Sequence, residues 1–169
     1  MTAPPPARSD LSALSREAGI HRVHIFAWRD LADAEAGGSE IHAAKVCALW
    51  AEAGLDVVMR TSHAQGHPSD ARRDGYRVVR KSGRYTVFPH TVLSELAHRY
   101  GPRDAIVEIW NGVPFLTPIW WHGPRMTFLN HVHRNMWEQV LRPPWSHVGR
   151  FIEGTLAPRF YRNTPVVTP

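Results

Sequence analysis

The sequence changes its apolar period twice within one short segment, and this change constrains the fold more than any other feature. Residues 21–28 alternate Val, Ile and Ala with His, Phe and Trp, a pattern typical of a strand buried on both faces. A turn with two glycines follows at 36–39, and from Glu40 the apolar residues recur at helical spacing until Gly54. Residues 55–59 then indicate a second buried strand. Strand, helix and strand in this order form a βαβ unit, which requires a parallel sheet.

The rest of the sequence continues this alternation of strands and helices. Further strands are predicted at 76–79, 85–88, 104–110 and 126–131, and another begins at 165–167. Helices are predicted at 11–18, 91–100, 114–121, 135–141 and 147–161. We therefore expect an α/β fold, with a Rossmann-like parallel sheet flanked by helices. We expect residues 1–20 to be a proline-rich, flexible tail and residues 21–169 to form one domain.

Length and cysteine usage are those of an ordinary globular protein. A chain of 169 residues buries about 70 % of the surface that its unfolded form exposes, so it needs no disulfide or structural metal. Its one cysteine, Cys47, cannot form an internal disulfide and falls on the apolar face of the predicted helix. No run of 18 apolar residues is present, and residues 1–10 lack the apolar stretch of a secretory signal. We therefore expect a cytoplasmic protein.

The glycine turn is the first candidate site. A helix presents unpaired backbone N–H groups and the positive end of its dipole at its N-terminus, and together these bind phosphate. Gly37 and Gly38 would let an anion approach the backbone, and Ser39 could donate to one of its oxygens. The alternative is a tight turn that Ser39 caps, with Glu40 favourably placed in the first turn. Neither the dinucleotide motif GxGxxG nor the P-loop motif is present, which argues against nicotinamide enzymes and ATPases.

A second candidate site follows the strand predicted at 126–131. His131 and His133 stand two positions apart on an extended segment and would point to the same side, with Arg134 next to them. Ligands of open α/β sheets bind just beyond this edge, so the pair could bind a metal or orient a sugar hydroxyl. Alternatively, both are solvent-facing loop residues. Because no Cys or carboxylate cluster accompanies the histidines, we expect no metal and no cofactor.

A third candidate is a run of cations. Six lie within thirteen residues: Arg72, Arg73, Arg77, Arg80, Lys81 and Arg84. Spread over a surface, they could contact an anionic membrane, although a solvated basic face is the alternative explanation. Few aromatic residues are interleaved with them, so we expect no nucleic-acid partner. Arginine supplies 18 of the 20 basic residues of the chain, which favours anionic partners or reflects a compositional bias.

Several segments, taken in order, resemble the N-terminal domain of the family 4 retaining glycosyltransferases. They are AGGSEIH at 36–42, LWAEAGLDV at 49–57, DAIVEIWNG at 104–112, FLNHVHRNMW at 128–137 and TPVVTP at 164–169. The family has the GT-B architecture, in which two Rossmann-like domains face each other across a cleft. The resemblance implies that this chain is a single N-terminal GT-B-type domain, incomplete at its C-terminus. It also implies that a C-terminal GT-B domain would have to come from a separate partner.

The resemblance also implies roles for particular residues. Gly37, Gly38 and Ser39 match the glycine loop near the donor phosphates. His131, with His133 as the alternative, matches the histidine that contacts the donor sugar and helps to organise the reaction centre. The candidates for acceptor or sugar contacts are Trp110, Asn111 and Arg134.

The implied function is that of the acceptor-side half of a hexosyltransferase-type glycosyltransferase. It would transfer a sugar from a nucleotide-sugar donor to an unknown acceptor with retention of configuration. The alternative is a non-catalytic module that binds an anion or nucleotide, or an inactive fragment, because half a cleft cannot position both substrates.

Overall fold

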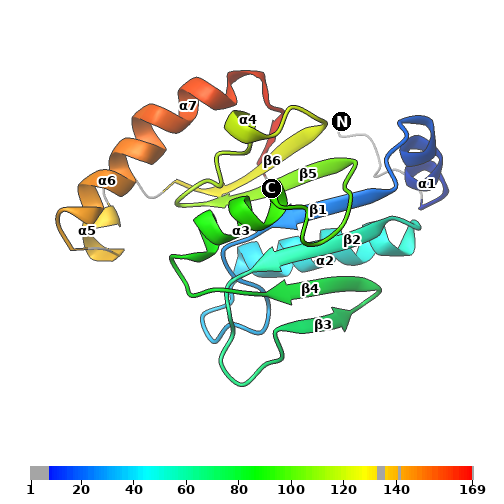
Figure 1. The fold of residues 1–169 in the computed structure, drawn as a ribbon, viewed down its shortest axis with the longest axis horizontal. Helices are drawn as coiled ribbons and strands as arrows, with labels where there is room; N and C mark the ends of the chain where they lie inside the picture. The colour runs from blue at the N-terminus through cyan, green and yellow to red at the C-terminus, as the bar shows by residue number, and fades with distance from the viewer. Residues whose placement is uncertain (1–7, 133–135, 141, 169) are drawn as a thin grey trace, which may run out of the picture.

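The computed structural model describes residues 8–132, 136–140 and 142–168. Its centre is a seven-stranded sheet with the order β3-β4-β2-β1-β5-β6-β7 (Figure 1). The strands are β1 (Arg22–Phe26), β2 (Asp56–Thr61), β3 (Asp70–Arg73), β4 (Tyr76–Arg80), β5 (Ala105–Asn111), β6 (Arg125–His131) and β7 (Val166–Val167). All neighbouring strands are parallel except β3 and β4. The predicted fold class, a Rossmann-like parallel sheet flanked by helices, is confirmed.

Helices cover both faces of the sheet. They are α1 (Arg8–Glu17), α2 (Gly38–Glu52), α3 (Val87–Leu96), α4 (Thr117–Trp120), α5 (Trp137–Val140), α6 (Trp145–Phe151) and α7 (Ala157–Phe160). A π-helical segment, η2 (Ile152–Leu156), joins α6 to α7, and a 3-10 turn, η3 (Tyr161–Asn163), follows α7. In Figure 1, α2 lies behind the sheet and α3 in front of it, while α6 and α7 form an arm along one side.

The order of the strands reverses at the middle of the sheet. From β1 the chain moves outward through β2 to β4, and α3 then carries it back to β5 on the other side of β1. It continues outward through β6 to β7. At such a reversal the connections leave neighbouring strands toward opposite faces, which opens a crevice beyond the carboxyl ends of the strands.

Most of the predicted elements are present with small shifts in their ends, but two expectations fail. The strand predicted at 85–88 is wrong: Thr86 Oγ1 accepts a hydrogen bond from Gly83 N at 3.0 Å, and this turn leads into α3 at Val87. Strand β3 was not predicted because Asp70–Arg73 carries only one apolar side chain, Ala71. An edge strand that pairs on one side needs little apolar pattern.

The two faces of the sheet differ in chemistry. The face toward α2 is apolar, with the buried side chains Val23, Ile25, Val57, Met59, Val78, Val107, Ile109 and Phe128 packed around Ala43 and Cys47. Burial raises the pKa of Cys47 to about 12, because the thiolate would lose its hydration. The other face mixes apolar side chains such as Phe26 and Ile106 with buried charges.

One buried cluster of charges joins the sheet to α3. Glu95 accepts from His24 Nδ1 at 2.8 Å, and the guanidinium groups of Arg60 and Arg103 lie 3.3 and 3.1 Å from its oxygens. Arg60 also stacks over the ring of Tyr100 at 3.5 Å. A buried charge that lost its partner would keep its full desolvation cost, so this cluster fixes the position of α3 on the strands.

A second buried carboxylate, Glu108, lies on the same face in the middle of β5. It accepts from the backbone N–H of Phe115 at 2.5 Å and from that of Thr117 at 3.4 Å, one on each oxygen. The hydroxyls of Thr117 and Tyr161 donate to it as well, at 2.7 Å each. Burial raises the pKa of Glu108, while these donors act in the opposite direction. The carboxylate thus fastens both the segment after β5 and the end of the arm to the sheet.

We expect Glu108→Gln to lower the free energy of unfolding by about 2 to 4 kcal/mol. An amide offers one acceptor oxygen where two backbone N–H groups need one each, so a buried donor stays unpaired. Urea unfolding of the wild type, Glu108→Gln and Tyr161→Phe measures the effect. Tyr161→Phe removes only one donor and should cost less. Equal stability of Glu108→Gln and the wild type would contradict this account.

A surface carboxylate, Asp104, joins the starts of β1 and β5. Its Oδ2 accepts from the N–H groups of His21 and Arg22 at 2.8 Å each. The N–H groups of Arg22 and then His21 lower the pKa of Asp104 below its usual value, because they stabilise the ionised form. A carboxylate whose pKa is lowered in the folded state stabilises the fold above its unfolded pKa, and loses this effect as the pH falls through the folded pKa.

We therefore expect Asp104→Asn to be less stable than the wild type at pH 7, with the difference shrinking as the pH falls below about 4. Unfolding by urea at a series of pH values measures it. The control is Asp74→Asn, because Asp74 is exposed at a φ of 46° that asparagine also adopts. A difference for Asp104→Asn that persists unchanged in acid would show that the lost ionised group is not its cause.

Candidate functional site

A hollow of about 470 Å³ opens at the carboxyl edge of the sheet. Its lining comes from the start of α2 and from the ends of β5 and β6, namely Gly38, Ser39, His42, Asn111, Asn130 and His131. These segments are far apart in the sequence and meet beside the strand reversal between β1 and β5. In open α/β sheets, ligands bind at this point.

The first wall of the hollow is the N-terminus of α2. Gly37 caps the helix, and its N–H donates to Glu40 Oε2 at 2.8 Å. Glu40 is buried, and its other oxygen lies 3.4 Å from Arg29 Nε, so the carboxylate is held within the turn. The backbone N–H groups of Gly38 and Ser39 lie in the first turn of α2, where the helix has no carbonyl to accept from them, and they point out of its N-terminal end. An anion in the hollow would meet these two donors and the positive end of the helix dipole.

Gly38 keeps this wall open. A Cβ added to Gly38 would meet no atom within 4 Å, and the residue is not among the glycines of positive φ. Neither the backbone nor the packing therefore requires glycine there. A side chain at position 38 would instead restrict the access of a ligand to the end of the helix.

The second wall comes from β5 and β6, and a β-bulge shapes it. Trp110 pairs with Leu129, but Asn111 pairs with His131, so the register skips Asn130. In a regular strand, adjacent side chains point to opposite faces. The bulge lets both Asn130 and His131 line the hollow, as bulges do when they redirect side chains. The amide of Asn111 donates to Ser39 Oγ at 3.1 Å and so joins the two walls.

The polar groups of the hollow suit an anion or a ligand rich in hydroxyls. Its described lining contains no carboxylate, whereas it contains two imidazoles and two amides. His42 packs edge-on against Phe128 at 5.2 Å, and its buried Nδ1 has no hydrogen-bond partner. The buried Nδ2 of Asn130 also has none. Two buried nitrogens in the lining side chains are thus left without a partner within the protein.

The structure brings together four of the residues predicted for the site, Gly38, Ser39, Asn111 and His131. Gly37 adjoins them as the helix cap. Trp110 lies elsewhere: it is 6 % exposed, its indole N–H donates to Gly112 O at 2.8 Å, and its ring packs on Tyr161 at 4.9 Å. His133 and Arg134 fall outside the described residues.

Two residues of the hollow were given no role in the sequence analysis: His42, and Asn130, which directly precedes His131 in the second candidate segment. His42 lies one turn after Gly38 on the same face of α2, so the spacing of four residues in the sequence could have indicated it. Asn130 enters the hollow only because of the bulge in β6, and no sequence pattern signals that bulge.

The cation run at 72–84 does not form one continuous basic surface. Arg80 is buried, with its guanidinium on both oxygens of Asp30, and is wrongly placed in a surface patch. Arg77 pairs with Asp70 and Arg84 with Glu35, and in both pairs the arginine lowers the pKa of the carboxyl group. Because these carboxylates neutralise their partners, the run offers an anionic surface far fewer cations than the sequence suggests.

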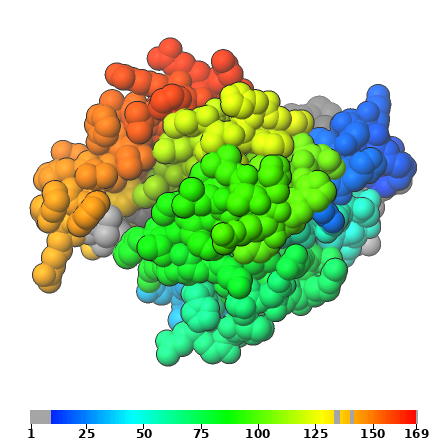
Figure 2. Space-filling model, viewed as in Figure 1, coloured from blue at the N-terminus to red at the C-terminus, as the bar shows by residue number. Residues whose placement is uncertain are grey.

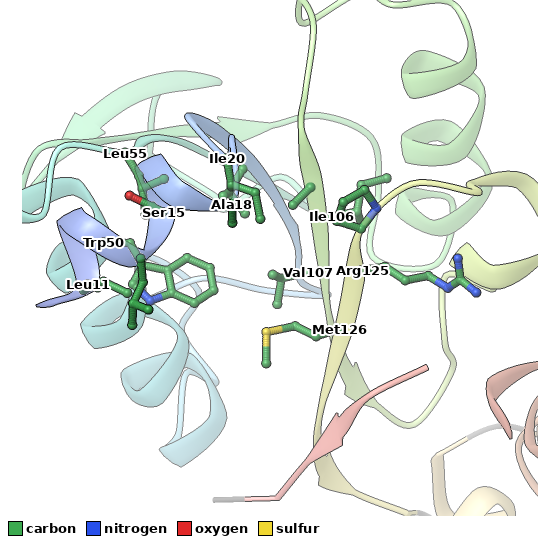
Figure 3. Close-up of a pocket in the computed structure, with 14 residues that line it drawn as sticks. Leu11, Ser15, Ala18, Ile20, Trp50, Leu55, Ile106, Val107, Arg125 and Met126 are labelled. Carbon is green, nitrogen blue, oxygen red and sulfur yellow. The ribbon is translucent and has the colours of Figure 1, made fainter. Parts of the chain in front are cut away.

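A second hollow, of about 320 Å³, lies near the opposite edge of the sheet (Figure 3). Its lining is almost entirely apolar and includes Leu11 and Leu14 of α1, Trp50 of α2, and Val107 and Met126 of the sheet. The charged end of Arg125 points away from the space, toward Thr164, to whose Oγ1 the Nε donates at 3.0 Å. Its one hydroxyl, that of Ser15, already donates to Ser12 O at 3.1 Å, so the hollow offers a ligand little to orient it, and we do not place the functional site here.

Within the described residues, no group of three or more His, Cys, Asp or Glu side chains is arranged to hold a metal ion. None of the described helices has the length and apolar character needed to cross a membrane.

Comparison of the sequence with known protein-family models finds no match, and comparison with curated proteins finds none either.

The hydrogen bond between Asn111 and Ser39 should be measurable as a coupling. We expect Ser39→Ala and Asn111→Ala each to lower the free energy of unfolding by about 1 kcal/mol, and the double variant to lower it by less than the sum. Urea unfolding of the four proteins gives the coupling energy. Strict additivity would show that the two walls of the hollow are not joined by this contact.

Proposed function

We propose that this chain is the acceptor-side half of a retaining glycosyltransferase and that the hollow beside α2 receives part of a nucleotide-sugar donor. The observation that carries the proposal is the convergence of Gly38, Ser39, Asn111 and His131 on one hollow at the strand reversal. The resemblance to the family 4 glycosyltransferases points to the same residues, although it was drawn from the order of motifs along the chain.

In the proposed complex, different residues of the hollow bind different parts of the donor. The N–H groups of Gly38 and Ser39 bind an oxygen of the diphosphate, because they combine free donors with the positive end of the helix dipole. His131 lies across the hollow and contacts the transferred sugar, and Asn111 holds the Ser39 hydroxyl in place. As bond cleavage leaves negative charge on the diphosphate, the fixed donors at the helix end stabilise that charge.

The rest of the donor site belongs to a C-terminal GT-B domain, which the proposal assigns to a partner of this domain. The nucleotide-sugar is a substrate here, and the proposal includes no metal or other cofactor. Transfer requires the two domains to hold donor and acceptor in line, so this half is expected to bind ligands but not to turn them over alone.

The second candidate function is a non-catalytic module that binds an anion or a nucleotide. The observation in its favour is that the hollow already contains what an anion needs, namely free N–H donors and no described carboxylate. Turnover separates the two candidates. The enzyme proposal predicts sugar transfer when the chain is combined with a matching C-terminal domain, whereas the binding module predicts ligand binding alone.

We expect a nucleoside diphosphate or its sugar conjugate to raise the melting temperature of the chain by about 5 to 11 °C, since a ligand at about 100 times its Kd adds about 2.7 kcal/mol of stability. Gly38→Val should abolish the shift, because the new side chain enters the hollow, and His131→Ala should reduce the shift for sugar conjugates in particular. Scanning fluorimetry with a panel of nucleotides measures both.

The matched control is Leu49→Val, which places a valine at an exposed position of the same helix away from the hollow. It should leave the shift unchanged. If no nucleotide or sugar nucleotide stabilises the wild type, or if Gly38→Val responds as the wild type does, the proposal fails.

A further inference from the structure

The arm formed by α6, η2, α7 and η3 presents an unusual outer face. In Figure 2 the arm, coloured orange to red, lies along one margin of the molecule. Three large apolar side chains of α6 are exposed at intervals of three residues, Trp145 at 66 %, Val148 at 42 % and Phe151 at 57 %. Residues three apart lie near one another on a helix, so the three side chains form one stripe.

The stripe faces outward because the inner face of the arm is fixed. The indole N–H of the buried Trp137 donates to the buried Glu153 at 2.9 Å. A Cβ added to Gly149 would lie 2.7 Å from the ring of Trp137, so the backbone of α6 packs directly on that indole. Rotation of the arm to bury the stripe would break both contacts.

The charged side chains of the arm and of the short segment before it are mostly positive. Four exposed arginines belong to the described residues from 136 onward: Arg142, Arg150, Arg159 and Arg162. Glu138 is the only exposed carboxylate in that part of the chain, and it lies 3.9 Å from Arg150. For Arg142, Arg159 and Arg162, no carboxylate of the described residues lies within ion-pair distance. Unlike Arg77, Arg80 and Arg84 of the run at 72–84, these three keep their charge available.

We propose that this outer face, consisting of Trp145, Val148 and Phe151 with Arg142, Arg159 and Arg162, docks on the surface of an anionic membrane. Amphipathic helices that lie on membranes combine a short apolar face containing Trp or Phe with flanking arginines. The rings enter the boundary between headgroups and acyl chains, and the guanidinium groups pair with lipid phosphates.

The small size of the stripe favours a membrane over a protein partner. A stable protein interface typically uses about 20 to 30 residues on each side, whereas a membrane contact needs a few apolar anchors and several cations. The proposal does not depend on the glycosyltransferase function. The segment after β6 leads into the arm, and His131 at the end of β6 lines the hollow, so docking would hold the carboxyl edge of the sheet near the lipid.

The test is flotation of the full chain with vesicles of phosphatidylcholine alone and of phosphatidylcholine mixed with phosphatidylglycerol. We expect binding to the mixed vesicles that weakens with added salt. Replacing Trp145 and Phe151 together by serine should lower the partition coefficient at least about tenfold, because two exposed rings no longer enter the lipid. Arg159→Gln with Arg162→Gln should lower it at least about fivefold.

Two matched controls separate this face from the rest of the molecule. Leu93→Ser with Leu96→Ser removes two apolar side chains of α3 that are also exposed, at 66 % and 50 %. Arg72→Gln with Lys81→Gln removes the exposed cations of the run at 72–84. Both should bind vesicles as the wild type does, and melting curves of all variants report whether each one folds.

Three outcomes overturn the proposal. The wild type fails to bind mixed vesicles, or a control variant loses as much binding as the arm variants do. The third outcome is that the wild type forms dimers in sedimentation velocity, that the variant with Trp145 and Phe151 replaced does not, and that neither protein binds vesicles. That result would make the stripe a protein interface. Nucleotide binding is measured separately, so the outcome here leaves the proposed sugar-transfer site untouched.

Discussion

The buried carboxylate of Glu108 is the contact on which the part of the molecule around the hollow depends. It lies in the middle of β5 and accepts from Phe115 and Thr117 on the segment that follows the strand, and from Tyr161 at the end of the arm. A buried carboxylate is tolerated only where donors replace its hydration, so the backbone has to approach it closely. Both the loop that leaves β5 after Asn111 and the arm that returns to β7 are therefore positioned by one side chain.

This constraint explains why the hollow has defined walls. The segment after Asn111 is drawn back toward Glu108, which leaves the end of β5 free to meet α2 through Ser39. On the other side, the bulge in β6 turns Asn130 and His131 into the same space. The site depends on two local irregularities, a glycine helix start and a bulge, added to a regular parallel sheet. Regular strands alone would have placed half of these side chains on the opposite face.

The regular elements could be predicted from the sequence, whereas the local irregularities could not. The buried strands β1 and β5 and the helix α2 were predicted because their apolar periods are unambiguous. Gly38 followed from the glycine turn at the start of a helix and His131 from its place at the carboxyl end of a strand, whereas Asn111 came only from the resemblance to the glycosyltransferase family. The strand expected at 85–88 failed because a Gly83 to Thr86 turn outweighs a short apolar run. Trp110 was predicted as a sugar contact but packs away from the hollow. The sequence does not reveal toward which side of a strand end a ring packs. Asn130 depends on the bulge, which no periodicity encodes.

Charge was the least predictable property, for a physical reason. A run of cations along the chain becomes a basic surface only if no carboxylate from elsewhere neutralises it. The carboxylates that neutralise Arg80 and Arg84 are Asp30 and Glu35, which lie about fifty positions earlier and come close only through the parallel crossover. In the arm, the carboxylate nearest in sequence to the exposed arginines, Glu153, is buried against Trp137. Which arginines keep an unpaired charge is therefore set by which carboxylates the sheet brings to them: Arg77, Arg80 and Arg84 of the densest basic run are neutralised, whereas Arg159 and Arg162 of the arm have no carboxylate of the described residues within ion-pair distance.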